Sequence, residues 1–163
     1  MRNQLTRGTL AGVVVSVSVL FLVVNSAHAE SRPFRMSSQG HANPIPVDDC
    51  TLTNSEVGTG QALHLGALTW FSNEVVDLCA EGGPQVSAEF VLTAANGDQV
   101  FGHLRTVARL DFATNQITFA GLWEIDGGTG RFENATGLGE LSGWGNLLPP
   151  FEVTAEFSGE IQY

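Results

Sequence analysis

The chain has 163 residues and a formal net charge of −10 at pH 7, with 17 acidic side chains against seven basic ones and no lysine. Surfaces that bind nucleic acid or anionic lipid headgroups need clustered basic side chains to neutralise phosphate. This charge balance argues against nucleic-acid partners, and against a membrane partner once a signal segment has been removed.

The first 29 residues have the three-part pattern of a secretory signal peptide. Two arginines precede an apolar run over residues 10–24, and small residues then place the cleavage site after Ala29. The alternative is a retained membrane anchor, but the run is shorter than the roughly 20 residues that a spanning helix needs. We therefore predict a signal peptide over residues 1–29 and a secreted or periplasmic location for the remainder.

Residues 30–49 differ in composition from the rest of the chain after the apolar run. They contain three prolines and no apolar periodicity. Such a composition is typical of a mobile segment rather than of a core element. We predict a flexible leader over residues 30–49 and a single domain over residues 50–163.

Cys50 and Cys79 are the only cysteines. An even number of cysteines in an exported chain favours a disulfide. Two buried free thiols are the alternative, and no suitably spaced histidine turns the pair into a zinc site. We predict a Cys50–Cys79 disulfide, no metal site and no cofactor.

From Cys50 onward, apolar and polar residues alternate with a period of two, which predicts strands. In the last run, Val153, Ala155 and Phe157 alternate with polar residues, so one face points inward and the other meets water. Short polar turns such as Asn96-Gly97 indicate hairpins between the strands. The predicted strands cover residues 52–57, 62–76, 86–93, 99–110, 117–125, 138–148 and 151–161.

Glycines recur inside these predicted strands, among them Gly66, Gly102, Gly121, Gly139 and Gly159. An interior glycine packs no side chain and costs ordering entropy, so repeated use indicates coiling, bulges or close approach of neighbouring elements. Such curvature favours a closed barrel over a flat sandwich. The predicted fold class is all-β, a single antiparallel β-barrel.

The stretch Asp126–Gly137 (DGGTGRFENATG), the glycine loop, has the glycine content of a phosphate-binding loop. A phosphate loop needs a helix after its glycines, because the helix N-terminus supplies donors and a positive dipole. The next residues, LGELSGWGNLL, are too rich in glycine for a helix, and no Gly-Lys-Ser/Thr motif occurs. We predict that the glycine loop turns a corner between two strands.

The glycine loop also resembles the glycine turn of the allene oxide cyclase and dirigent superfamily, in Gly127-Gly128-Thr129-Gly130-Arg131-Phe132 followed by Ala135 and Gly137. Weaker similarities to small exported bacterial members of unassigned function lie in Ala62-x-His64-Leu65-Gly66, in Ala94–Asp98 and in Gly159–Tyr163. The resemblance spans residues 50–163. It implies an eight-stranded antiparallel barrel in which the loop is a structural connection, and it transfers no catalytic residue.

Five side chains are candidates for ligand contact, each with an ordinary structural alternative. His64 and His103 are hydrogen-bond partners or proton donors at a barrel mouth, or merely packed or surface histidines. Arg105 shares a strand face with His103 and either receives an anionic group or forms a surface ion pair. Trp123 packs in the core or lines a pocket, and Glu124 is a cavity carboxylate or an exposed one.

No nucleophile motif such as Gly-x-Ser-x-Gly is present. We therefore expect an exported barrel that binds a small, largely apolar molecule or serves as a non-catalytic accessory domain. Two alternatives stay open. One is a cavity enzyme of cyclase or isomerase type, since catalysis by shape needs few conspicuous residues; the other is a structural homo-oligomer that associates through its outer face.

Overall fold

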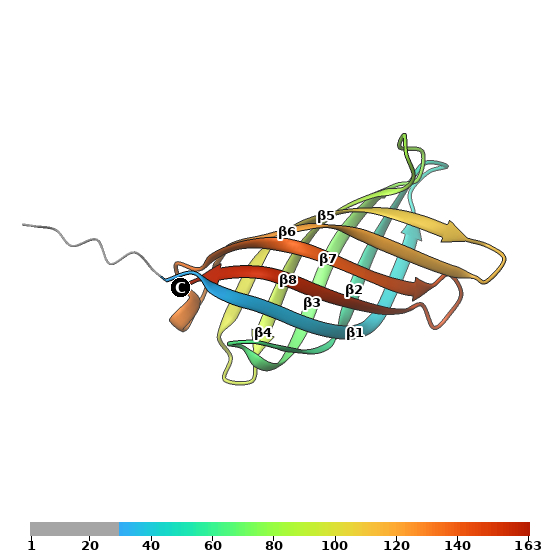
Figure 1. The fold of residues 1–163 in the computed structure, drawn as a ribbon. Coiled ribbons are helices and arrows are strands. Elements are labelled where there is room, and N and C mark those ends of the chain that lie inside the picture. The colour runs from blue at the N-terminus through green and yellow to red at the C-terminus, as the bar shows by residue number, and fades with distance from the viewer. Residues whose placement is uncertain (1–29) are drawn as a thin grey trace, which may run out of the picture.

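The computed structural model describes residues 30–163, which form a closed barrel of eight antiparallel strands (Figure 1). Each strand pairs with its neighbours in chain order, and the first strand closes the barrel against the last. The predicted all-β antiparallel barrel is confirmed; the predicted signal peptide, residues 1–29, lies outside the described residues. The strands are β1 (Arg32–Pro46), β2 (Thr51–Ala62), β3 (Gly66–Asp77), β4 (Gln85–Ala94), β5 (Gln99–Asp111), β6 (Gln116–Gly128), β7 (Thr136–Asn146) and β8 (Glu152–Gln162).

The segment predicted as a flexible leader is strand β1, so that prediction was wrong. Phe34, Met36 and Ser38 are buried on its inner face. Pro44 and Pro46 do not prevent pairing, because the ladder with β8 ends at His41 and the stretch beyond it pairs with β2 alone. Pro33 pairs with β8 before the ladder with β2 begins at Met36. A strand edge without a ladder partner tolerates proline, which has no N–H to donate. The barrel therefore begins at residue 32 rather than at Cys50.

The single strand predicted over residues 62–76 is divided by a turn. β2 ends at Ala62 and β3 begins at Gly66. His64, predicted to lie in a strand, lies in this turn with φ of 73°. Apolar residues on both sides of the turn conceal it, because they continue the alternation without a break.

The strand glycines give room to aromatic rings inside the barrel. A Cβ atom at Gly58 would lie 2.6 Å from Nε1 of Trp70, and one at Gly40 would lie 2.8 Å from Cζ2 of the same ring. Gly139 stands in the same relation to Trp123, at 2.6 Å from Cζ2. Close approach of neighbouring elements, one of the reasons predicted for these glycines, is therefore what the structure shows.

One end of the barrel, which we call the filled end, is packed with large side chains. Phe34 lies 5.2 Å from Trp123 between ring centroids, and Phe132 lies 4.8 Å from Tyr163. Phe132 is fully buried, as is Ile161. The filled end carries the β2–β3, β4–β5 and β6–β7 connections. The other connections lie at the opposite end, which we call the open end.

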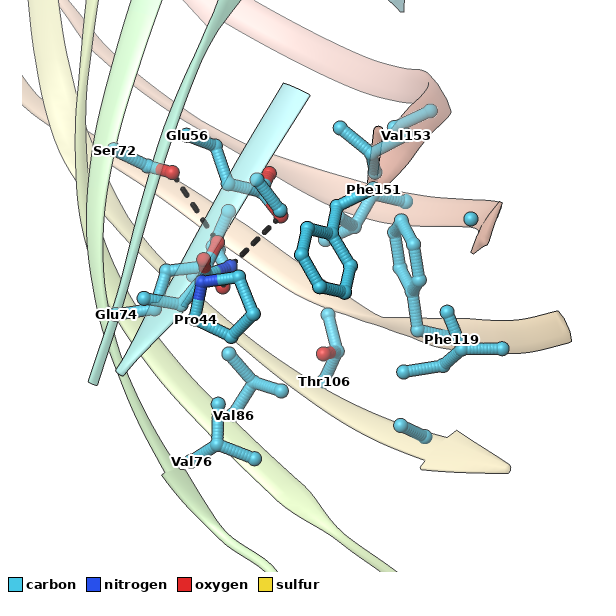
Figure 2. A pocket seen from close by; sticks show the side chains of 18 of the residues that line it. Pro44, Glu56, Ser72, Glu74, Val76, Val86, Thr106, Phe119, Phe151 and Val153 are labelled. Atoms are coloured by element: carbon cyan, nitrogen blue, oxygen red, sulfur yellow. Dashed lines mark hydrogen bonds between the residues drawn. The ribbon is translucent and has the colours of Figure 1, made fainter. Parts of the chain in front are cut away.

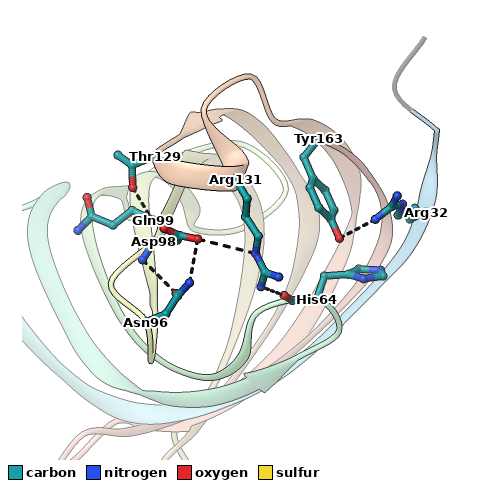
Figure 3. A network of polar contacts seen from close by, with 8 residues as sticks. All are labelled: Arg32, His64, Asn96, Asp98, Gln99, Thr129, Arg131 and Tyr163. Atoms are coloured by element: carbon teal, nitrogen blue, oxygen red, sulfur yellow. Dashed lines mark hydrogen bonds and ion pairs between the residues drawn. The ribbon is translucent and has the colours of Figure 1, made fainter. Parts of the chain in front are cut away.

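The glycine loop turns the predicted corner, because it passes through a single 3₁₀ turn into β7 and not into an α-helix. Arg131 in this turn donates a hydrogen bond to the backbone carbonyl of His64 and lies 3.8 Å from the Asp98 carboxylate (Figure 3). The hydroxyl oxygen of Thr129 accepts a hydrogen bond from the backbone N–H of Gln99 at 2.9 Å. The loop therefore joins neighbouring turns across the filled end.

The predicted disulfide between Cys50 and Cys79 is confirmed, with 5.2 Å between the Cα atoms. It joins the β1–β2 turn to the segment between β3 and β4, and both lie at the open end. A covalent link thus constrains the end of the barrel that has fewer large side chains to pack.

Candidate functional site

The open end of the barrel holds a cavity of about 310 Å³. An eight-stranded barrel is just wide enough for side chains to fill it or for one small ligand to enter. The size of the inward residues therefore decides which occurs. Small residues line the cavity where the filled end has phenylalanine and tryptophan; they include Ala42, Thr106, Ala108, Val153 and Ala155.

Aromatic rings form much of the apolar lining. Trp70, Phe90 and Phe157 contribute from different strands, and Phe119 contributes from β6. Phe151 comes from the β7–β8 turn, where its φ of 51° is unusual for a residue other than glycine. Figure 2 shows the rings of Phe151 and Phe119 together on the side of the cavity away from Glu56 and Glu74. Such a wall suits a flat or branched apolar molecule.

A polar cluster occupies the opposite part of the wall, on β2 and β3. Asn54 lies directly across from Glu74, and Glu56 across from Ser72, so all four side chains point inward. The Asn54 amide nitrogen donates to Glu56 Oε1 at 3.1 Å and to Glu74 Oε2 at 2.9 Å. The Ser72 hydroxyl donates to Glu74 Oε1 at 3.2 Å (Figure 2). The two carboxyl groups thus share one donor, the Asn54 amide, and Glu74 has a second donor in Ser72.

The surroundings of this pair disfavour its full ionisation. Burial raises the pKa of Glu56 from its usual 4.5 to about 8, and the neighbouring Glu74 carboxylate adds to the rise. Burial also raises the pKa of Glu74, against the opposing effect of its hydrogen bonds from Asn54 and Ser72. A low-dielectric wall penalises charge, and two close carboxylates repel each other. The pair therefore retains a proton at neutral pH.

The cavity lining is acidic in its ionisable groups. Among the described residues that line it, Glu56, Glu74 and Glu152 carry carboxyl groups and none is arginine, lysine or histidine. Glu152 lies exposed near the mouth, whereas the other two are deeper in the wall. One further polar atom, the indole Nε1 of Trp70, is buried without a hydrogen-bond partner in the described chain. An apolar cavity with a single acidic side is what the open end offers a ligand.

Three of the five predicted ligand contacts lie on the outer surface. His103 and Arg105 share a face of β5 as predicted, but it is the outer one, since Leu104 and Thr106 face inward. Glu124 is exposed on β6. His103 Nδ1 lies 2.9 Å from Asp126 Oδ2, and its Nε2 lies 3.4 Å from Glu124 Oε2. These three side chains do not face the interior, so the structure agrees with the surface alternative for each of them.

The remaining two predicted contacts belong to the filled end. His64 Nε2 lies 3.0 Å from the carbonyl oxygen of Pro33, away from the cavity. Trp123 is buried, and its indole N–H donates to the carbonyl oxygen of Glu140 at 3.0 Å. Trp123 therefore packs in the core, which was its structural alternative, and it does not line the cavity.

Sequence reasoning missed Glu56 and Glu74 because a glutamate in a strand is ordinarily placed on the solvent face. One signal could have found them. Glu74 shares strand parity with Trp70, and Glu56 shares it with Gly58, which leaves space for the Trp70 ring. Because side chains alternate strictly, that parity places both carboxyl groups inside.

Comparison with protein-family models, with curated proteins and with solved structures found no match to this chain. The resemblance to the allene oxide cyclase and dirigent superfamily therefore stays a prediction. Within residues 30–163, no group of three or more histidine, cysteine, aspartate or glutamate side chains could hold a metal ion. The same residues include no helix that is long and apolar enough to cross a membrane.

Proposed function

We propose that this protein is an exported β-barrel that binds one small, largely apolar molecule in the cavity at its open end. The observation that carries the proposal is the contrast within one barrel: large side chains fill one end, while about 310 Å³ stays open at the other. That volume lies at the small end of the range of ligand pockets. The aromatic lining would supply the binding free energy by apolar burial.

Export is part of the proposal, and two observations support it. The N-terminal residues have a signal-peptide pattern. The Cys50–Cys79 disulfide is compatible with the oxidising conditions outside the cytoplasm. Membership of the allene oxide cyclase and dirigent superfamily is proposed on the glycine loop, and the eight-stranded barrel agrees with it.

The proposal is tested by blocking the cavity from one strand. Val86 on β4 lines the cavity, and the adjacent Ser87 points outward. We expect native mass spectrometry of the chain from Glu30 onward, mixed with lipophilic metabolites, to show a retained small molecule. Val86→Trp should abolish retention, and Ser87→Trp should leave it intact, with thermal unfolding verifying both folds. No retention by the unmodified protein, or equal retention by both variants, contradicts the proposal.

A cavity enzyme is a second candidate, favoured by the carboxyl pair in the apolar wall. A protonated Glu56 could donate a proton while an ionised Glu74 accepts one, the division of roles that isomerisation needs. The test is the chemical fate of the retained molecule after long incubation. Recovery of the molecule unchanged supports a binding protein, and conversion to an isomer, lost in Glu56→Gln, supports an enzyme.

Association through the outer face is a third candidate. Val57, Phe71, Val91 and Phe101 lie directly across from one another on β2 to β5 and face outward, where Val57 is 55% exposed. A contiguous exposed apolar row is unusual on a monomer. Light scattering tests this candidate. A molecular mass that rises with protein concentration, and that returns to the monomer value in Phe71→Ser, supports association. A monomeric mass at high concentration contradicts it.

A further inference from the structure

In the polar cluster of the cavity, the donor groups of Asn54 and Ser72 already have hydrogen-bond partners within the cluster. Both contacts made by the Asn54 amide nitrogen go to Glu56 and Glu74, and its carbonyl oxygen accepts the backbone N–H of Asn43 at 2.9 Å. The Ser72 hydroxyl is also directed at Glu74. Apart from the proton that the pair retains at neutral pH, what the cluster offers a ligand is therefore acceptor capacity on its carboxyl oxygens, which suits a ligand that brings donors.

The charge of the surroundings decides what kind of donor fits. A ligand anion would meet Glu56, Glu74 and Glu152 in a cavity whose described lining has no basic side chain. A ligand cation would instead meet two carboxyl groups that lack a positive partner in the wall. Charge-assisted hydrogen bonds of this kind are about twice as strong as neutral ones. The whole chain, at net −10, also attracts cations toward its surface.

The apolar lining determines the rest of the ligand. Figure 2 shows Phe119 and Phe151 on one side of the cavity and the two carboxyl groups on the other. A ligand that contacts both sides must carry its charge at one end and an apolar body at the other. Aromatic faces also attract a cation that lies within about 6 Å of the ring centre.

We infer that the cavity binds a lipophilic amine, with the ammonium group against Glu56 and Glu74 and the apolar body against Phe119 and Phe151. This inference rests on the proposed function and narrows it to one class of ligand. A primary or secondary amine suits the site, because its N–H groups can be shared between the two carboxylates.

Binding of an amine would be linked to pH. From β1, Ala42 and Pro44 adjoin the cluster, and from β4, Ala88 adjoins it; none of them ionises. Among the described residues that adjoin the cluster, the ionisable ones are Glu56 and Glu74. With the pKa of Glu56 at about 8, the pair must give up its proton to become fully charged, so an amine should bind more tightly as the pH rises toward that value. A neutral ligand that accepts a hydrogen bond from protonated Glu56 should show the opposite trend.

The test uses three probes of matched shape: 1-naphthylmethylamine, 1-naphthalenemethanol and 1-naphthoic acid. Isothermal titration calorimetry of the chain from Glu30 onward should give an affinity for the amine about ten-fold or more above that for the alcohol at about pH 7.5. The naphthoate should bind most weakly. Repeating the titration at about pH 5.5 should narrow the gap between amine and alcohol.

A pair of double variants separates the cavity from overall charge. Glu56→Gln with Glu74→Gln should abolish the preference for the amine and keep the alcohol affinity within about two-fold, since the apolar wall is unchanged. Glu124→Gln with Glu140→Gln replaces the same number of carboxyl groups, here on the outer surface, and should keep the preference.

The outcomes distinguish the amine inference from the proposed function on which it rests. Equal binding of amine and alcohol, or a preference that survives the cavity variant, overturns the amine inference and leaves a cavity that binds apolar molecules. Absence of binding for all three probes, together with no retained molecule in native mass spectrometry, overturns both.

Discussion

The filled end and the open end of this barrel are built from the same eight strands and the same alternation of side chains, yet one is solid and the other hollow. The inward positions account for the difference. The rings of Phe34, Trp123 and Phe132 fill the interior of the filled end, whereas the aromatic rings that line the open end are interspersed with alanine, valine and threonine and leave a cavity. Stability and ligand binding can thus be assigned to different ends of one sheet, because interior volume depends on side chains and not on the ladder.

The open end has two features that the filled end lacks: a disulfide at its rim and a carboxyl pair in its wall. The disulfide offsets missing core contacts by restricting the unfolded chain. The carboxyl pair has the reverse effect, since burying charge costs free energy unless something compensates it. Retaining such a pair makes physical sense where a ligand supplies the compensation.

The largest expected effect separates the two ends with matched substitutions. Phe34→Ala at the filled end should lower the free energy of unfolding by about 4 kcal/mol, because removing a buried ring leaves a cavity in a closely packed site. Phe151→Ala at the cavity mouth should cost about 1 kcal/mol, because that ring already borders open space. Urea unfolding measures both. Similar losses would mean that the open end is as solid as the filled one.

Removing the disulfide should have the next largest effect. The bridge closes a loop with a sequence separation of 29 residues. On the chain-entropy model, Cys50→Ala with Cys79→Ala should cost about 3.5 kcal/mol. Hydrogen exchange should accelerate more at the open end than at the filled end, with reduced wild-type protein as the control. A variant as stable as the oxidised protein would contradict this expectation.

The carboxyl pair should make stability depend on pH. The folded pKa of Glu56, about 8, lies above its usual 4.5, so its stabilising contribution is complete below about pH 4.5 and is lost as the pH rises toward 8. Glu56→Gln cannot ionise, so it should flatten that profile and raise stability at about pH 8 by about 1–2 kcal/mol. Thermal unfolding across this range measures the effect. Parallel profiles for the variant and the wild type would show that the pair carries no penalty.

The smallest effect is expected on the outer surface. His103→Ala removes the contacts with Asp126 and Glu124 but leaves the inner face of β5 unchanged. We expect a change in stability within about 0.5 kcal/mol and unchanged ligand affinity. Calorimetry and urea unfolding measure both quantities. A large loss of ligand affinity would show that His103 takes part in binding after all.

The barrel could be predicted from the sequence, because alternation and turn residues are local signals. Strand β1 could not, since Ser38 and Gly40 occupy inward positions and its prolines imitate a linker. Its pairing with β8 is a contact between the two ends of the domain, and no local pattern encodes it.

The inner and outer faces were harder to assign than the strands. On β5, Phe101 and Val107 are 39% and 46% exposed, so the outer face is also partly apolar. Hydrophobicity alone therefore does not distinguish the outer face of this strand from the inner one. On β2, the inner face carries Asn54 and Glu56, the residue types normally placed outside. Strand parity can place Glu56 and Glu74 inside, but the cavity itself becomes visible only when all eight strands are assembled.

Backbone NMR with 1-naphthalenemethanol, the neutral probe, tests most directly that the hollow end of the barrel is the binding site. Amide shifts should change at cavity residues such as Thr106, Ala108 and Val153 and stay fixed at Val100 and Ile161 in the filled end. Changes confined to the outer strand faces, or no saturable change at any position, would contradict a ligand site inside the barrel.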